Sequence, residues 1–234
     1  MENASKALIM AGSVLLSVLI ISALVLLFNQ IGAFKRSEVS EKDIEKLAEY
    51  TKQIETFNRE LYGSELLSLC NLIEDYNARQ ADLKGYDEIE VAIKQENPIE
   101  SLILNSSGSG TTSEISIKGY YTSSKGLVKD FQKLEDRVNT LKKKKYYGKD
   151  IEKLAGLKDR ELKAYLADKV SGIENLDLSD ISSIANSTLK EMLINKENYV
   201  GLKTDLTTFK NKKFTIKYTY NNDTLRVKKI EANG

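Results

Sequence analysis

The sequence contains no histidine and no tryptophan, and it has one cysteine, Cys70, and one proline, Pro98. The missing histidine excludes the usual zinc sites and histidine-based catalytic triads, and a lone cysteine excludes an intrachain disulfide. Lysine and arginine number 35 against 34 aspartates and glutamates, so the net charge of +1 gives no overall field to attract nucleic acid. No acidic spacing resembles a calcium loop, and no glycine pattern cradles phosphate. We therefore expect no cofactor, no metal site and no nucleic-acid partner.

Only one long hydrophobic run is present, at residues 7–28, where ALIMAGSVLLSVLIISALVLLF has no charged side chain. As a helix these 22 residues would be about 33 Å long, close to the ~30 Å hydrocarbon core of a bilayer. The run predicts a transmembrane anchor at residues 7–31, behind a short tail of residues 1–6. The anchor would include Ala7, Gly12, Ser17 and Phe28.

A cleaved signal peptide is the alternative to an anchor, because Ile31-Gly32-Ala33 resembles a weak cleavage box. The run is longer than the roughly 7–15 apolar residues of a signal peptide, and only Lys6 and the amino terminus supply positive charge before it. We therefore interpret the run as a retained signal-anchor.

Positive charge does not fix the orientation of this anchor, because Lys6 lies before the run and Lys35 and Arg36 lie after it. A short head before a large domain usually stays inside while the rest of the chain is exported. We expect a single-pass protein of the cell membrane, in contact with the lipid bilayer through its N-terminal helix, with an extracytoplasmic C-terminal domain.

Residues 32–62 have the apolar spacing of an amphipathic helix, which would continue from the anchor. The apolar positions that we call the seam are Ile44, Leu47, Ile54 and Leu61. A coiled coil through the seam would produce a homo-oligomer or a larger membrane assembly. Packing of the seam against the chain's own domain is equally compatible with the pattern, so both interpretations stay open.

Residues 63–234 are expected to form one domain. Gly63 ends the preceding helix, and Ser64 is suited to cap a helix over SELLSLCNLIEDYNARQ. Cys70 falls on the apolar stripe of this helix. We interpret Cys70 as a small buried hydrophobic residue, because no histidine exists to activate a catalytic thiol.

Strand patterns occur at both ends of this domain. Period-two alternation at residues 86–94, a short run at 101–104 and EISIKGYY at 114–121 predict a meander of three strands. Alternation on both sides of Asn221-Asn222-Asp223 predicts a C-terminal hairpin at about residues 213–231. We expect these strands to meet in one antiparallel sheet.

Helical spacing fills the stretch between the strands, at about residues 127–195, with Ser179 and Asp180 capping its third helix. Strands, then helices, then strands are typical of an α+β fold. We expect an N-terminal transmembrane helix that continues into an amphipathic helix, then an antiparallel sheet with a helical insertion.

One dense basic patch follows the first helix of the insertion. Its members are Lys142, Lys143, Lys144, Lys145 and Lys149. Lysines favour the carboxyl end of a helix, so a solvated basic turn explains the run. Contact with anionic lipid headgroups or a wall polymer is the alternative, because clustered lysines are attracted to anionic surfaces.

Ser187 and Lys190 have the S-x-x-K spacing of penicillin-recognising enzymes and other serine–lysine hydrolases. The companion elements of those enzymes are missing, since Ser179-Asp180 is followed by Ile181. We interpret the pair as part of an exposed helix face and expect no catalytic residue.

Three segments support a resemblance to a known group: MENASKALIMAGSVLL, LYGSELLSLCNLIEDYN and FTIKYTYNNDTLRVKKI. Over its whole length the chain resembles uncharacterised single-pass membrane proteins of low-GC Gram-positive bacteria, and this resemblance implies no activity. In layout it is similar to type IV pilins and pseudopilins, which polymerise through their first helix. The pilin cleavage motif is not kept, because Gly12 lies inside the apolar run and the fifth residue after it is Ser17.

Together these patterns predict a membrane-anchored, non-enzymatic structural or assembly protein, displayed outside the cell and pilin-like in layout. The alternative is a tethered binding module that contacts anionic wall polymer, lipid headgroups or a protein partner.

Overall fold

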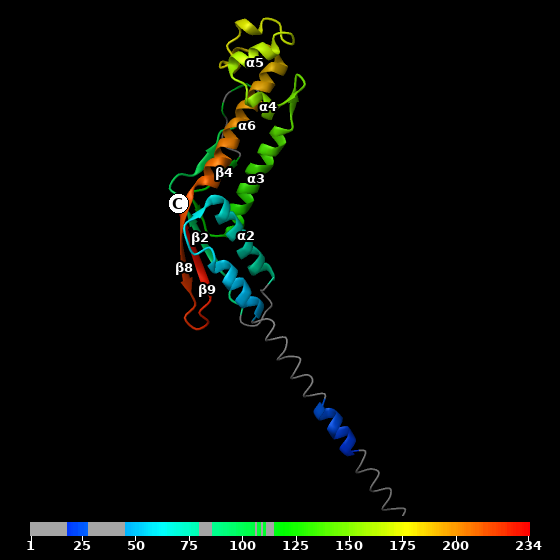
Figure 1. Cartoon of the computed structure of the whole chain (residues 1–234), viewed down its shortest axis with the longest axis vertical. Helices are drawn as coiled ribbons and strands as arrows, with labels where there is room; N and C mark the ends of the chain where they lie inside the picture. The colour runs from blue at the N-terminus through cyan, green and yellow to red at the C-terminus, as the bar shows by residue number, and fades with distance from the viewer. Residues whose placement is uncertain (1–17, 28–44, 80–85, 106, 109, 111–114) are drawn as a thin grey trace, which may run out of the picture. The chain divides into compact units, whose positions relative to one another are not determined.

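The computed structural model describes residues 18–27, 45–79, 86–105, 107, 108, 110 and 115–234 (Figure 1). The chain divides into two units, Met1–Tyr50 with Asp82–Tyr86, and Thr51–Ala81 with Asp87–Gly234. Ala7, Gly12, Ser17, Phe28 and Ile44, all named above from the sequence, lie outside the described residues.

In the first unit, residues 18–27 are helical and every side chain is exposed. The large apolar side chains of this stretch expose between 48% (Leu24) and 61% (Leu26) of their surface. Among the residues with a described position, no helix is both long and apolar enough to cross a bilayer.

The helix predicted over residues 32–62 ends earlier than expected, at residue 55, and within the described residues it occupies 45–55. The N–H groups of Thr56, Phe57 and Asn58 bond to carbonyls three residues back, at 3.3, 3.1 and 3.0 Å, which closes the helix in a tight turn. These three residues are weak helix formers. The prediction of a helix to residue 62 is therefore wrong, and Leu61 lies in a strand.

Five strands of the second unit form one sheet in the order β1 (Leu61–Tyr62), β8 (Lys213–Tyr220), β9 (Val227–Asn233), β2 (Glu90–Lys94) and β5 (Tyr120–Tyr121). The predicted C-terminal hairpin is confirmed as the antiparallel pair β8–β9. Strands β2 and β9 run parallel, so the expectation of a wholly antiparallel sheet is wrong. Alternation identifies the buried face of a strand and not its direction, and the long helical connection permits a parallel pair.

The predicted three-strand meander is also wrong, because EISIKGYY divides into two strands. Strand β4 (Ile115–Ile117) pairs with β3 (Ile99–Ser101) in a separate ribbon, and β5 joins the main sheet beside β2. Gly119 lies at the break, where a Cβ atom would be 3.3 Å from the carbonyl oxygen of Gln95. The amide of Gln95 donates to the carbonyls of Ile117 and Lys118, at 3.0 and 2.9 Å, and so holds the break in place.

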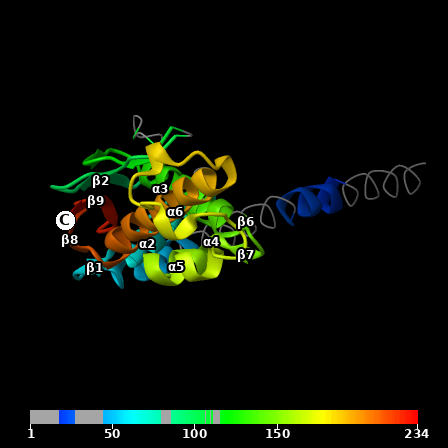
Figure 2. The same ribbon diagram turned by 90° about the horizontal axis from the view of Figure 1, so that it is seen from above.

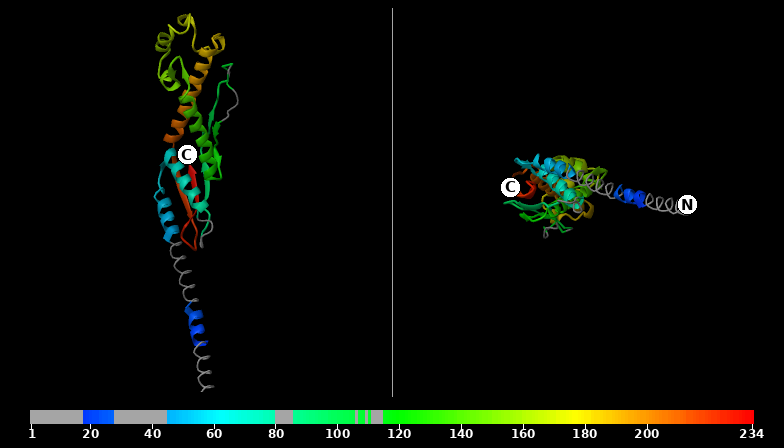
Figure 3. Two further views of the ribbon diagram at one scale, coloured as in Figure 1. Left: turned by 90° about the vertical axis from the view of Figure 1, so that its right-hand side faces the viewer. Right: turned by 90° about the horizontal axis from the view of Figure 1, so that it is seen from below.

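Helices of the second unit lie mainly between β5 and β8 in sequence. They are α2 (Gly63–Arg79), α3 (Ser124–Lys142), α4 (Ile151–Ala155), α5 (Asp159–Leu166) and α6 (Ser187–Asn211), with 3-10 turns η1 (Ile173–Asn175) and η2 (Ile181–Ser183). Helices α3 and α6 run side by side, and α4 and α5 lie at the end of this pair farthest from the sheet (Figures 1 and 3). In the view from above, the strands of the sheet lie together at one side of the helices (Figure 2).

The third helix of the insertion begins later and ends later than expected. Its N-cap is Asn186, whose side-chain oxygen accepts the N–H of Leu189 at 3.0 Å, and α6 continues to Asn211. Ser179 and Asp180 lie in the turn before η2, so their predicted capping role is wrong.

Three phenylalanines join α3, α6 and β8 in the core. Phe209 of α6 lies 5.2 Å from Phe131 and 5.8 Å from Phe214 between ring centroids, and both Phe209 and Phe214 are fully buried. Tilted aromatic pairs at these distances add to the free energy of burial. The cluster therefore fixes the end of α6 against the first strand of the hairpin.

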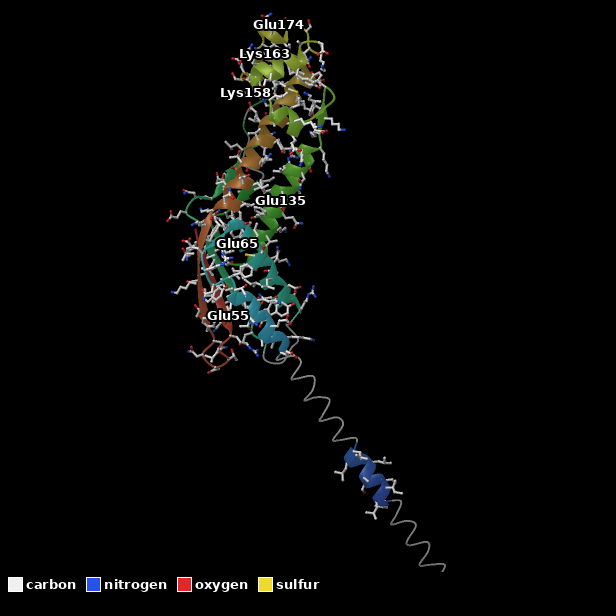
Figure 4. All side chains as sticks on the ribbon, in the orientation of Figure 1. Glu55, Glu65, Glu135, Lys158, Lys163 and Glu174 are labelled. Carbon is white, nitrogen blue, oxygen red and sulfur yellow. The ribbon has the colours of Figure 1, made fainter. Side chains whose placement is uncertain are left out.

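The start of α2 packs against the same place. The N–H of Gly63 donates to the carbonyl of Lys212 at 2.8 Å, and a Cβ atom on Gly63 would lie 2.0 Å from the carbonyl oxygen of Phe209. Glu65, labelled in Figure 4, closes this helix end by accepting the N–H of Tyr62 at 2.9 Å. The pKa of Glu65 is lowered, mainly by the hydrogen bond from Arg59 and to a smaller extent by this N–H.

Replacing Gly63 with alanine should destabilise the domain by about 2–4 kcal/mol, because the added methyl group cannot fit beside the backbone of Phe209. Urea unfolding followed by circular dichroism measures the change.

Gly201→Ala, in the middle of α6, is the matched control. A Cβ atom there meets nothing within 4 Å, so stability should rise by about 0.5–1 kcal/mol. Equal effects of the two substitutions would contradict the packing described for Gly63.

Candidate functional site

A cavity of about 500 Å³ lies between α3 and the first half of α6. The turn after α3 and the segment after β3 complete its walls, and we call it the α3–α6 cavity. Its charged and amide side chains are Asn105, Arg137, Lys144, Lys190, Glu191, Asn195 and Asn198. The apolar side chains of Leu104 and Ile194 also line it, so the cavity offers both polar and apolar contacts.

Two buried asparagines of α6 hold the walls of the cavity together. Asn198, 5% exposed, accepts the N–H of Leu104 at 2.7 Å and donates to its carbonyl at 3.1 Å. Asn195, 7% exposed, donates to the hydroxyl of Tyr146 at 2.8 Å and to the carbonyl of Glu191 at 3.0 Å. These side-chain amides bond to protein groups and not to water, so they fix the walls of the cavity without a ligand.

Arg137 projects from α3 into the wall of the cavity. Its Nε atom is buried and has no hydrogen-bond partner, and within the described part of the chain the guanidinium forms no ion pair. Buried charged donors are normally satisfied, because leaving one unpaired costs desolvation energy. The Nε–H of Arg137 is therefore the group of the cavity for which an anionic hydrogen-bond acceptor is missing.

Two lysines add positive charge to the same cavity. Lys144 lies 3.6 Å from the carboxylate of Glu191, and Lys190 donates to the carbonyl of Ser182 at 3.4 Å. With Arg137 these lysines give the lining three positive charges against the single negative charge of Glu191. The walls thus have a formal excess of two positive charges.

Glu191, the one carboxylate of the cavity lining, has partners other than Arg137. Its carboxylate accepts the hydroxyl of Tyr146 at 2.5 Å and lies beside Lys144. The pKa of Tyr146 is raised, mainly by burial and to a smaller extent by the hydrogen bond to Glu191. Tyr146 therefore stays a neutral donor, and Glu191 does not neutralise the guanidinium.

The predicted lysine patch is divided by the structure. Lys145 and Lys149 lie in the small hairpin of β6 (Lys145–Tyr146) and β7 (Lys149–Asp150). Lys142 pairs with Glu152 at 3.3 Å, Lys145 with Asp150 at 3.9 Å, and Lys149 lies 3.7 Å from the centroid of the Tyr165 ring. Lys143 is exposed on the turn, and of the five only Lys144 lines the cavity. These pairs favour the solvated basic turn over one continuous anionic-partner surface.

Ser187 and Lys190 both line the α3–α6 cavity, at the start of α6. The interpretation as a plain exposed helix face was thus incomplete. No sequence pattern connects this pair with Arg137 and Lys144, which come from another helix and a turn. The available signal was the pair Asn195 and Asn198, amides spaced three residues apart and therefore on one face of α6.

The seam residues with described positions are buried within the single chain. Ile54 is 0% exposed, Leu47 0% and Leu61 1%. Leu61 pairs with Phe214 in the sheet, and the carbonyl of Ile54 accepts the hydroxyl of Tyr218 at 2.6 Å. This is the packing alternative stated for the seam, and it leaves Ile54 and Leu61 without free apolar surface for a second chain.

Cys70 is 0% exposed on α2, as expected for a small buried hydrophobic residue. The pKa of its thiol is raised to about 12, mainly by burial and to a smaller extent by the negative charge of the nearby Glu74. The thiol is therefore protonated at neutral pH and unsuited to nucleophilic chemistry.

Within the described ranges no three histidine, cysteine, aspartate or glutamate side chains gather closely enough to hold a metal ion. No family model, curated protein or solved structure matches this chain.

Replacing Ile54 with alanine should cost about 2–5 kcal/mol of domain stability, because it opens a cavity in a filled core. The size of the protein on detergent gel filtration should not change. Asn58→Ala, at an exposed position in the turn that closes the same helix, is the control and should change stability by less than about 0.5 kcal/mol. Dissociation of a larger complex by Ile54→Ala, with stability unchanged, would restore the oligomerisation hypothesis.

Cys70 should not react with maleimide at pH 7.5 in the native protein and should react fully in urea, because burial excludes the reagent and keeps the thiol protonated. Mass spectrometry counts the adducts. Complete labelling of the folded protein would contradict the described packing of α2.

Proposed function

We propose that this protein is a membrane-anchored, non-enzymatic binding module, with its α+β domain displayed on the outer side of the cell membrane. The single observation that supports binding most strongly is the α3–α6 cavity, whose wall contains Arg137, a half-buried arginine with a buried Nε–H that has no hydrogen-bond partner. The membrane anchor and the orientation rest on the sequence.

The anchor proposal rests on the uncharged run at residues 7–28. Two features of residues 18–27 agree with it. A helix that is apolar on every side needs an apolar surrounding, and these side chains are all exposed. The hydroxyl of Ser22 donates to the carbonyl of Val18 at 2.8 Å, so it needs no water. The basic residues give no preference for either orientation, so the outward orientation is the part of the proposal that cysteine labelling tests.

A binding role fits the domain better than assembly through the seam. The pilin-like hypothesis requires an apolar helix face that another copy can reach, whereas Ile54 and Leu61 are used inside the domain. The cavity instead has charged groups whose partners are incomplete. We therefore favour a tethered module that binds through the α3–α6 cavity.

A non-enzymatic role is supported by the chemistry of the available groups. The sequence lacks histidine, and the Cys70 thiol is buried with a raised pKa. In the cavity lining, the groups that could act as a general base for Ser187 are lysines and Glu191, and the carboxylate of Glu191 is bonded to Tyr146. The groups of the cavity are suited to holding an anion.

Cysteine labelling in intact cells tests the proposed display. Ser107 is exposed, and the native Cys70 is buried and serves as the silent background, so Ser107→Cys adds one reactive site. A membrane-impermeant maleimide should label this variant in intact cells, and the labelled chain should stay in carbonate-washed membranes.

The unsubstituted chain is the matched control and should remain unlabelled. Labelling of the variant only after lysis would place the domain on the inner side, and release of the chain by carbonate would remove the anchor from the proposal.

A further inference from the structure

We propose that the α3–α6 cavity binds a small phosphorylated molecule, with its phosphate group at Arg137, Lys144 and Lys190. This inference deepens the proposed function, because it names the ligand class of the same cavity. It does not depend on the membrane orientation.

Arg137 indicates an anionic ligand. Its Nε–H is buried without a partner, and the carboxylate of the same cavity, Glu191, is bonded to Tyr146 and lies beside Lys144. An arginine guanidinium is planar and binds the oxygens of a phosphate or carboxylate through two parallel hydrogen bonds. Because no described residue of the chain supplies this partner, we assign it to an oxyanion of the ligand.

The charge of the lining favours phosphate over carboxylate. Arg137, Lys144 and Lys190 against Glu191 leave a formal excess of two positive charges. A phosphate monoester has nearly two negative charges at neutral pH, whereas a carboxylate has one. Of these two groups, the phosphate balances the charge of the lining more completely.

The size of the cavity indicates that the ligand is larger than the phosphate group alone. Small-molecule sites have volumes of about 300–1,000 Å³, and this cavity has about 500 Å³. Leu104 and Ile194 supply apolar surface, and the Asn105 side chain adds an amide, so a small organic group attached to the phosphate would fill the remaining space.

Alternative uses of the cavity groups are less complete. Ser187 with Lys190 alone would leave the buried Arg137 Nε–H unexplained. The other lysines of the basic turn, Lys142, Lys145 and Lys149, already have partners and lie outside the lining.

Calorimetric titration of the full chain in an uncharged detergent tests the proposal, with phenyl phosphate as the probe. We expect saturable binding of one molecule per chain, and binding about tenfold weaker for benzoate, which has the same ring and one negative charge. Arg137→Gln should weaken phenyl phosphate binding by about tenfold or more.

Two further variants keep the test independent of any effect of Arg137→Gln on folding. Lys190→Gln should also weaken binding, and Lys143→Gln, which removes an exposed lysine outside the lining, should leave it unchanged. The proposal would be overturned if phenyl phosphate did not bind, or if benzoate bound as tightly as phenyl phosphate. It would also be overturned if all three variants lost the same amount of affinity for phenyl phosphate.

Vesicles separate the two sources of such a phosphate. Binding to vesicles that contain phosphatidic acid, reduced by Arg137→Gln and by Lys190→Gln, would support a lipid headgroup as the ligand. Binding of phenyl phosphate without binding to these vesicles would support a soluble phosphate ester. If the protein binds neither phenyl phosphate nor these vesicles, the phosphate site is rejected. If its Ser107→Cys variant is still labelled in intact cells, the proposed membrane display stands.

Discussion

The packing around Phe209 is the constraint on which the rest of the domain depends. Its ring lies between Phe131 of α3 and Phe214 of β8, and its carbonyl faces Gly63 at the start of α2. Three helices and the C-terminal hairpin thus meet at one side chain. Because this junction is filled without space for one more methyl group, it fixes the direction in which α3 and α6 leave the sheet.

The α3–α6 cavity is a consequence of that arrangement. Near the sheet the two helices are joined by aromatic packing and by the ion pair of Lys210 with Glu135, at 2.8 Å. Glu135 is labelled in Figure 4. Farther along, polar side chains replace the aromatic ones, and the amide of Asn198 binds the segment after β3. The fold therefore supports a charged space from both sides, and the unpaired guanidinium of Arg137 lies in its wall.

Local patterns predicted the elements that depend on local chemistry. The buried Val91 and Ile93 of β2, the hairpin β8–β9 and the burial of Cys70 all follow from apolar periodicity. The parallel pairing of β2 with β9 did not follow, because strand direction depends on distant partners. The cavity was missed for the same reason, since Arg137, Lys144 and Lys190 belong to three separate segments that only the tertiary fold brings together.

The Nε–H resonance of Arg137 gives the most direct test of the account. In the free protein this proton is buried without a partner, so its signal should be protected from exchange with solvent and should move strongly downfield when phenyl phosphate is added. The shift should saturate at one equivalent, while the resonance of the exposed Arg59, which is paired with Glu65, stays in place. A signal of Arg137 that does not change at saturating phenyl phosphate would contradict the central claim that the α3–α6 cavity binds an anion.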